Sequence, residues 1–533
     1  MKGSHVRHLF NEPGDRERVR AELGHAAAGN ARIALAMASY MVWLIACCTG
    51  PAVVLGAQGS GGGEMLLPAW LGPLACMAAA SAVIAVWFKR TRKVPSATSW
   101  TVALASLMTL AAALHLVWAL DTGLPTAARG ALYLLASLVM GVGCALFRVE
   151  VDRVFGWIGT QQTLYQGMLA TVATAAVLAM LAVAGRVSGS GDLPLLAAPL
   201  VLPFAGAALL RSVVGGFPRA RYYGHGRDVP LPFPAKFAAT SCVQGLAAGV
   251  LFAGMFALGG DGAGVAAVFA GAGGAEAVAW TSSFGSTALC SVGQLAAVAL
   301  LFGTLVFLRL DFNRLVYKVA FPFVALGFVL LALLPDATAV GSAVLAAGFC
   351  YLDLVLWSLG ACLMKNMGLP ATWIASCPGA ALFCGVVVGA GLALGFLGAE
   401  MSPDAALLAS CVACLVLAAA LFLSSGSNLK YGWGTVRPGE SSLAAGDMAG
   451  VVKFVATERA VTQRESEVML LLAEGKSRRA VCEALSVSPD TVKTHVRSIY
   501  RKLAVHSQQE LIDYLARERE DLAADGSEHP LGA

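Results

Sequence analysis

The polar side chains with the most specific arrangement lie between Pro489 and Leu503, near the C-terminal end of the chain. Four apolar residues recur there at the spacing of one helix face: Val492, Val496, Ile499 and Leu503. The other faces carry cationic and hydroxyl side chains, opposed by one acid, Asp490: Lys493, Thr494, His495, Arg497, Arg501 and Lys502. Lysine and arginine bind phosphate, and arginine also pairs with guanine. The pattern predicts either a helix that binds nucleic acid or a solvated basic face.

Three neighbouring helices would hold this basic helix in place and favour the first interpretation. A capping box at Thr462 and Glu465 predicts the start of the first helix. The second helix is short, and the turn residues Ser486–Ser488 separate it from the basic helix, which the last of them caps. A second capping box, at Ser507 and Glu510, opens a fourth helix. Four short helices with such a turn between the second and the third predict a helix-turn-helix.

This segment resembles the LuxR-type helix-turn-helix family. The positions that carry the likeness are Thr462, Arg464, Glu465, Val468, Leu472, Ala473, Gly475, Thr491, Val492, Lys493, His495, Ile499, Lys502, Leu503 and Val505. Two features depart from the family pattern: Arg478-Arg479 stand where Asn-Lys is common, and Gln508 stands where an arginine is common. The first departure adds positive charge, and the second bears on the packing of the fourth helix.

The resemblance implies a role for each polar residue of the domain. The residues that match positions reaching into the major groove are Lys493, Thr494 and Arg497. The residues that match positions near the phosphate backbone are Ser488, Thr491, His495, Arg501 and Lys502. The fourth helix, around Leu511 to Leu515, is implied to support a homodimer. The partners implied are double-stranded DNA and RNA polymerase.

The rest of the chain has the composition of a membrane protein. Of its 533 residues, 58% are hydrophobic and 13% are charged, whereas soluble proteins carry roughly 25% charged residues. A spanning helix needs about 20 predominantly apolar residues. Twelve segments meet this requirement: 33–55, 67–88, 98–120, 127–147, 163–185, 193–211, 237–258, 284–308, 315–334, 338–364, 371–397 and 404–424. The predicted fold class is therefore all-α, a polytopic bundle followed by a four-helix domain.

The loops between these segments predict the orientation in the membrane. Alternate loops hold lysine and arginine, for example Lys89 to Lys93 and Arg148 with Arg153, whereas the others hold mainly acids, such as Asp121 and Asp336. Positive residues concentrate on the cytoplasmic side. We therefore expect a multi-pass protein of the inner membrane, surrounded by lipid, with both termini in the cytoplasm.

The longest basic loop, about 212–236, divides the spans into six plus six. That layout resembles the major facilitator superfamily, whose two halves are parallel repeats. The predicted regions are a cytoplasmic N-terminal segment 1–32, a transmembrane domain 33–424, a flexible linker 425–456, the helix-turn-helix domain 457–520 and a disordered tail 521–533.

The sequence leaves two roles open for the spans: sensing an unknown small-molecule ligand, or secondary transport with an attached DNA-binding domain. Ionisable groups inside the spans bear on the choice. Three were identified: Asp353, the candidate ligand or proton site; His115, interpreted as a packed residue; and Arg129 at an edge. Their scarcity favours the sensor. A mere anchor would not need so many spans.

The sequence predicts no catalytic residue, no metal site and no cofactor, and therefore no enzyme. Of the 13 cysteines, only Cys482 lies outside the apolar segments or their edges. The pair Cys411 and Cys414 forms a CxxC, but it lies in an apolar run with no partner pair or histidine nearby.

Overall fold

The structure is a computed structural model of the chain, and it divides into two compact units, Met1–Pro438 and Gly439–Ala533. It describes residues 16, 19–21, 23–24, 31–49, 70–92, 101–120, 123–214, 231, 233–256, 283–308, 310–334, 338–367, 369–398, 405–425, 451–452, 455–456, 459, 461–473, 478–485 and 487–527. Most of the predicted linker lies outside these residues, as does Gly475.

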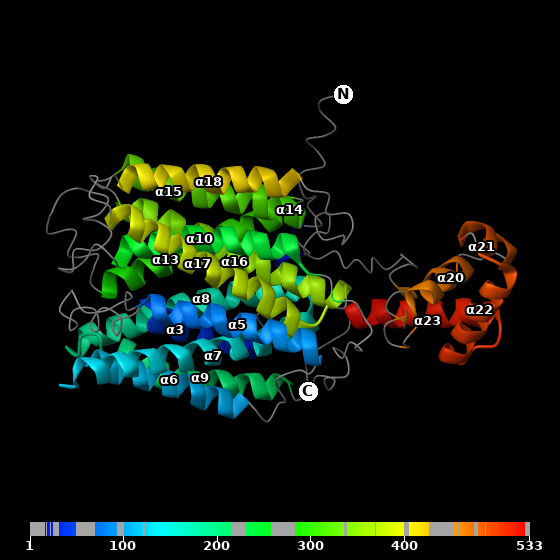
Figure 1. Cartoon of the computed structure of the whole chain (residues 1–533), viewed down its shortest axis with the longest axis horizontal. Helices are drawn as coiled ribbons and strands as arrows, with labels where there is room; N and C mark the ends of the chain where they lie inside the picture. The colour runs from blue at the N-terminus through cyan, green and yellow to red at the C-terminus, as the bar shows by residue number, and fades with distance from the viewer. Residues whose placement is uncertain are drawn as a thin grey trace. The chain divides into compact units, whose positions relative to one another are not determined.

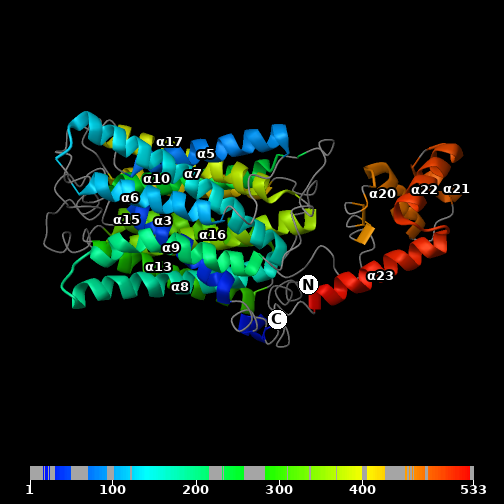
Figure 2. The same ribbon diagram turned by 90° about the horizontal axis from the view of Figure 1, so that it is seen from below.

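The first unit is a bundle of long helices that lie side by side (Figures 1 and 2). Among the described residues, twelve helices are long and apolar enough to cross a bilayer. Their bounds are α3 Ala31–Thr49, α5 Leu71–Thr91, α6 Thr101–Ala119, α7 Thr126–Ile158, α8 Thr160–Val187, α9 Leu193–Val214, α10 Ala235–Phe256, α13 Ser283–Phe307, the succession α14 Phe312–Arg314, η3 Leu315–Ala320 and α15 Phe321–Leu333, then α16 Thr338–Met367, α17 Ala371–Gly398 and α18 Ala405–Ser425. Helices satisfy their backbone hydrogen bonds internally, as hydrocarbon requires. The twelve predicted spans and the all-α fold class are confirmed.

The bundle consists of two six-helix halves, α3 to α9 and α10 to α18. Within the first half, α3 packs against α9 and α6 against α7; within the second, α10 packs against α17 and α15 against α16. The halves meet where α5 lies against α17, α8 against α13, and α7 and α8 against α16. Side chains on the facing sides of α7 and α16 therefore lie at the boundary between the two halves.

The predicted end of the fourth span at 147 was wrong. Helix α7 continues to Ile158, and Gly159, with φ of 84°, separates it from α8. The added turns carry four charged residues that the sequence placed in or beside a cytoplasmic loop: Arg148, Glu150, Asp152 and Arg153. These charges pair along the helix, at 3.8 Å between Arg148 Nε and Asp152 Oδ2 and at 3.2 Å between Arg153 Nη1 and Glu150 Oε2. Pairing about one turn apart offsets these charges and supports the continued helix.

The second unit has a core of its own, formed by four helices: α20 Gln463–Ala473, α21 Arg478–Leu485, α22 Pro489–Leu503 and α23 Gln508–Ser527. Two of its predicted boundaries were wrong. Four residues assigned to the linker are buried in this core, so the domain begins before 457: Val451, Val452, Val455 and Ala456. The region from 521, predicted to be disordered, is helical up to Ser527 because α23 continues.

Glycines bring α10 and α17 into backbone contact. Each helix offers two glycines one turn apart: Gly245 and Gly249 on α10, Gly385 and Gly389 on α17. A Cβ at Gly249 would overlap the backbone oxygen of Val386, and a Cβ at Gly385 would overlap that of Cys242. Small residues allow this approach, and van der Waals packing then holds the helices together in lipid.

We predict that Gly249→Ala destabilises the membrane unit by about 1–3 kcal/mol, because its methyl group meets backbone rather than a movable side chain. The measurement is the thermal unfolding midpoint of the purified full-length protein in detergent. Gly395→Ala on α17 is the control, since a Cβ there meets nothing within 4 Å. Equal midpoints for the two variants would contradict the proposed contact.

Candidate nucleic-acid interface and buried polar cluster

Helix α22 begins and ends at well-formed caps. Ser488 is the N-cap, and its hydroxyl accepts a hydrogen bond from the Thr491 backbone N–H at 3.2 Å. Pro489 follows at the first helical position, where its missing N–H costs nothing. The helix ends at Ala504, which adopts the left-handed conformation with φ of 54°. These caps fix where α22 begins and ends.

The apolar and cationic faces of α22 separate as the sequence predicts. The four predicted apolar residues are buried in the core of the unit: Val492, Val496, Ile499 and Leu503. Lys493, Arg497 and Arg501 are exposed and stand four residues apart, which gives one cationic stripe along the helix. Thr494 is exposed and donates its hydroxyl to the Asp490 carbonyl at 2.9 Å, and His495 is half-buried.

Lys502, the remaining predicted phosphate-binding residue, has a partner inside the domain. Its Nζ lies 2.6 Å from Glu465 Oε2, which joins α22 to the start of α20. The same oxygen accepts the Thr462 backbone N–H at 2.8 Å, so the predicted capping box is present. Burial raises the pKa of this carboxyl, but hydrogen bonds, led by the one from Lys502, outweigh burial and lower the pKa to about 2.

Two further side chains of this unit attach one helix to the end of another. Arg464 on α20 donates from Nη2 to the carbonyl of Leu485, the last residue of α21, at 2.9 Å. Gln508, the departure from the family pattern, donates from Nε2 to the Leu472 carbonyl near the end of α20 at 3.0 Å. Both bonds satisfy carbonyls that a helix end leaves open. The motif singled out Arg464, but its partner could not be found without the tertiary structure.

The two leucines that bound the predicted dimer segment of α23 pack inside the domain. Leu511 and Leu515 are both fully buried in the core of the second unit. The same stretch presents Ile512, Asp513 and Ala516 on its other faces, where they are half-buried or exposed. A second copy would therefore contact these faces of α23 rather than the two leucines.

A basic helix held by three others defines a helix-turn-helix domain, here in one chain with a multi-pass membrane unit. Residues 459–515 match the family described as bacterial regulatory proteins, luxR family. The chain is 43% identical over 56 residues to the uncharacterized response regulatory protein YgeK of Escherichia coli (strain K12), which is 10% of this chain and 38% of that protein. It is 39% identical over 57 residues to the HTH-type transcriptional regulator MalT of Yersinia pestis (strain Pestoides F), 11% of this chain and 6% of MalT.

The C-terminal domain is therefore a LuxR-type helix-turn-helix domain, as the resemblance predicted. The chain spans less than two fifths of YgeK and a small fraction of MalT, so the likeness belongs to this domain alone.

The membrane unit has the fold of a solved transporter. It aligns with a bacterial homologue of the iron transporter ferroportin in the outward-facing state with soaked iron, at a TM-score of 0.53 and 12% sequence identity. The alignment covers 74% of this chain and 99% of that one. At this identity the likeness defines the fold and says nothing of cargo.

Asp353 belongs to a polar cluster near the middle of the bundle. Its Oδ1 accepts a hydrogen bond from Gln244 Nε2 on α10 at 2.6 Å. Arg148 of α7 interacts electrostatically with Asp353 across the boundary between the halves, and it also faces Asp152. Sequence reasoning missed Arg148 and Asp152 because it ended the fourth span too early. The cluster therefore draws on both halves of the bundle.

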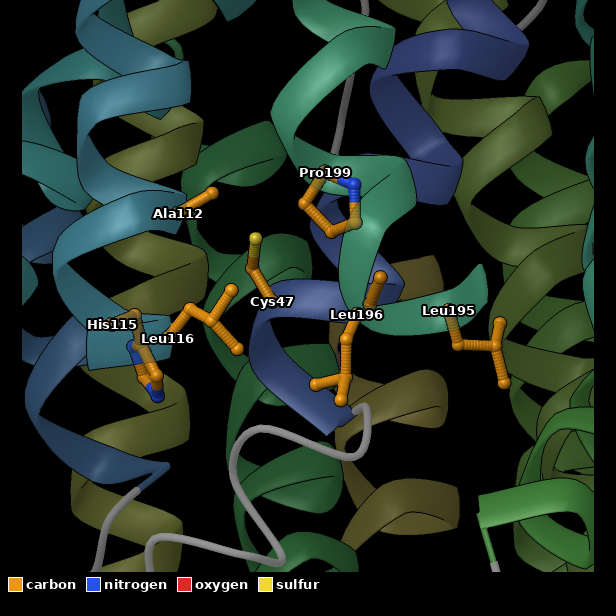
Figure 3. A pocket seen from close by; sticks show the side chains of 8 residues that line it. Cys47, Ala112, His115, Leu116, Leu195, Leu196 and Pro199 are labelled. Atoms are coloured by element: carbon orange, nitrogen blue, oxygen red, sulfur yellow. The ribbon is translucent and has the colours of Figure 1, made fainter. Parts of the chain in front are cut away.

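His115, the second ionisable group found in the sequence, lines a small apolar cavity between α3, α6 and α9 (Figure 3). The cavity has about 20 Å³, room for roughly one water molecule. Among the described residues neither ring nitrogen has a hydrogen-bond partner, and the ring packs edge-on against Trp118 at 5.1 Å. The Arg129 guanidinium carbon lies over the Trp118 ring, 5.8 Å from its centroid. His115 and Arg129 thus flank one tryptophan, far along the chain from Asp353.

We predict that Glu465→Gln destabilises the fragment 439–533 by roughly 2–3 kcal/mol at pH 7, because Lys502 loses its counter-ion. The folded-state pKa lies below the unfolded one. The stabilisation is therefore complete above the unfolded value and is lost as the pH falls from about 4.5 toward 2. Urea unfolding of both proteins at pH 7, 4 and 2.5 measures the difference.

Glu467→Gln is the matched control, since Glu467 lies on the same helix in an exposed pair with Arg464. It should change the free energy of unfolding by less than about 1 kcal/mol. A gap between wild type and Glu465→Gln that stays constant from pH 7 to pH 2.5 would rule out the buried ion pair as its source.

Proposed function

We propose that this chain is a membrane-embedded transcriptional regulator whose C-terminal domain binds promoter DNA. The observation that carries the proposal is the exposed stripe of Lys493, Arg497 and Arg501 on a capped helix inside a LuxR-type domain. An α-helix fits the major groove of B-DNA, where arginine pairs with guanine. MalT, which is similar in this region, is named a transcriptional regulator.

In the proposed complex, the residues facing base edges are Lys493, Thr494 and Arg497. The residues near phosphate are Ser488, Thr491, His495, Arg501 and Lys502. Lys502 reaches phosphate only by sharing its charge with Glu465, so Arg501 contributes more to the backbone contact. Two copies would bind through α23, and the bound dimer would alter the recruitment of RNA polymerase.

The membrane unit would reside in the inner membrane with both termini in the cytoplasm, where the C-terminal domain meets DNA. The positive loops support this orientation. At the N-terminal side, the Arg16 guanidinium lies 5.4 Å from the ring of Phe307, the last residue of α13, so both belong to one side of the bundle. The spans within the described residues number twelve, and an even number returns the chain to that same side.

The membrane unit is proposed to sense a small ligand at the cluster around Asp353. The transporter fold and the charged pair Arg148 and Asp152 favour the second candidate, a transporter that carries a regulatory domain. Both roles require a small molecule to bind between the two halves of the bundle. They differ in whether occupancy changes DNA binding or moves the occupant across the membrane.

We predict that Arg497→Ala weakens binding to the target promoter by roughly 1–3 kcal/mol if Arg497 reads a base. Binding to random DNA should change little, because phosphate contacts dominate it, and both affinities should fall steeply with salt. Fluorescence anisotropy of the domain with both duplexes at several salt concentrations is the measurement. Equal losses on the two duplexes would reassign Arg497 to the backbone.

Chromatin capture of the full-length protein in its native cell tests the proposed function itself. We expect discrete promoter peaks that disappear in the double variant Lys493→Ala/Arg497→Ala. They should persist in Arg90→Ala, which removes an exposed arginine from α5 of the membrane unit instead of α22. Absence of peaks while the protein is present would shift the function to the transporter.

A further inference from the structure

Asp353 forms no ion pair in the part of the chain that the structure describes, although Arg148 acts on it electrostatically from a greater distance. Among the described residues, no lysine, arginine or histidine nitrogen lies within 4 Å of it, and its hydrogen bond from Gln244 is a neutral one. The residue lies midway along α16 and is partly accessible rather than sealed. A charge at such a depth is costly and marks a functional group.

The cluster around Asp353 contains one more acidic group than basic groups. Arg148 and Asp152 face each other on α7 and balance, at 3.8 Å between Nε and Oδ2. Tyr40 of α3 also faces this pair, and its hydroxyl lies 3.0 Å from Cys144 Sγ, a neutral contact. The cluster therefore carries two acids and one base, and an occupant with a single positive charge would neutralise it.

An aromatic side chain lies one helical turn from Asp353, on the same face of α16. Trp357 is half-buried, and its ring lies 6.1 Å from that of Phe155 on α7. A Cβ at Gly167 of α8 would be 4.0 Å from the Trp357 ring, so this tryptophan reaches two helices of the first half. Indole rings attract cations and provide a flat apolar surface.

We propose that Asp353 and Trp357 form the binding site for a small organic cation, a protonated primary amine attached to an apolar group. The ammonium would pair with the Asp353 carboxylate, and the apolar group would lie on Trp357. This inference rests on the proposed sensing function and names the class of its ligand.

The site also explains how an occupant would act on the bundle. Asp353 and Trp357 belong to the second half, whereas Phe155, Gly167 and the Arg148–Asp152 pair belong to the first. An amine held at the boundary contacts both halves, and its affinity therefore depends on their arrangement. A ligand shifts a conformational equilibrium only through such a difference in affinity.

The test is the thermal unfolding of the full-length protein in detergent at pH 7, with four amines at 10 mM: 2-phenylethylamine, tryptamine, histamine and cyclohexylamine. Their comparators are 2-phenylethanol, which is neutral, 3-phenylpropionate, which is anionic, and sodium chloride. At least one amine should raise the midpoint by about 2 °C or more. The comparators should not raise it.

The variants assign the effect to the site. Asp353→Asn should weaken amine binding at least tenfold, Asp353→Glu should restore it to within about threefold, and Trp357→Ala should weaken it less than Asp353→Asn. Asp192→Asn, a carboxyl at the start of α9 outside the cluster, should bind like wild type. The conservative glutamate variant keeps the test decisive even where the asparagine variant unfolds.

The proposal is overturned if none of the four amines raises the unfolding midpoint. It is also overturned if the alcohol or the carboxylate raises the midpoint equally well, or if sodium chloride alone raises it. Protection that survives Asp353→Asn would also overturn it. Promoter occupancy depends on α22 and amine protection on α16. Promoter peaks without amine binding would therefore refute this site alone, and amine binding without peaks would refute the regulator alone.

Discussion

A charged side chain in the hydrocarbon of a bilayer costs several kcal/mol unless another group compensates it. This cost keeps charge out of most of the twelve long helices and concentrates it in loops and in the C-terminal domain. Four charged residues near the C-terminal end of α7 form two pairs, Arg148 with Asp152 and Arg153 with Glu150. Asp353 departs from this rule among the described residues, since a neutral amide is its hydrogen-bond partner. The cluster between the halves is thus the feature of the membrane unit that folding in lipid alone does not require.

The C-terminal domain uses charge in the opposite way, because water surrounds it. One ion pair is buried: Glu465 caps α20 and holds Lys502 of α22, which sets the position of one helix relative to the other. The remaining cations of α22 are left in solvent. Burying an ion pair costs desolvation, but its directional bonds fix one arrangement of helices. The proposed presentation of Lys493 and Arg497 to a DNA groove needs such a fixed arrangement.

Much of this architecture could be predicted from the sequence, for physical reasons that also explain the failures. An apolar run long enough to cross a bilayer is a local signal, as are the capping boxes at Thr462 and Ser507, so the spans and the four short helices were found. The end of α7 was missed because Arg148 and Asp152 look like loop residues until their pairing is known. The partner of Lys502 lies 37 residues away, and the burial of Val451 and Val455 depends on helices that follow them. Such contacts are not encoded in local spacing.

The longer α7 also changes the comparison between sensor and transporter. Few ionisable groups within the predicted spans favoured the sensor, but Arg148 and Asp152 on the longer α7 remove that scarcity. The two roles differ in what ligand binding causes: a change in DNA binding for a sensor, or movement of the ligand across the membrane for a transporter. Helix α16, which carries Asp353, packs against α7 and α8 of the first half and against α15. Helix α15 in turn packs against α18, the twelfth of the described spans. A rearrangement at the boundary between the halves is therefore connected to α18 by packed helices. A transporter needs this boundary only to open and close in turn, whereas a regulator needs one arrangement to persist while the ligand stays bound.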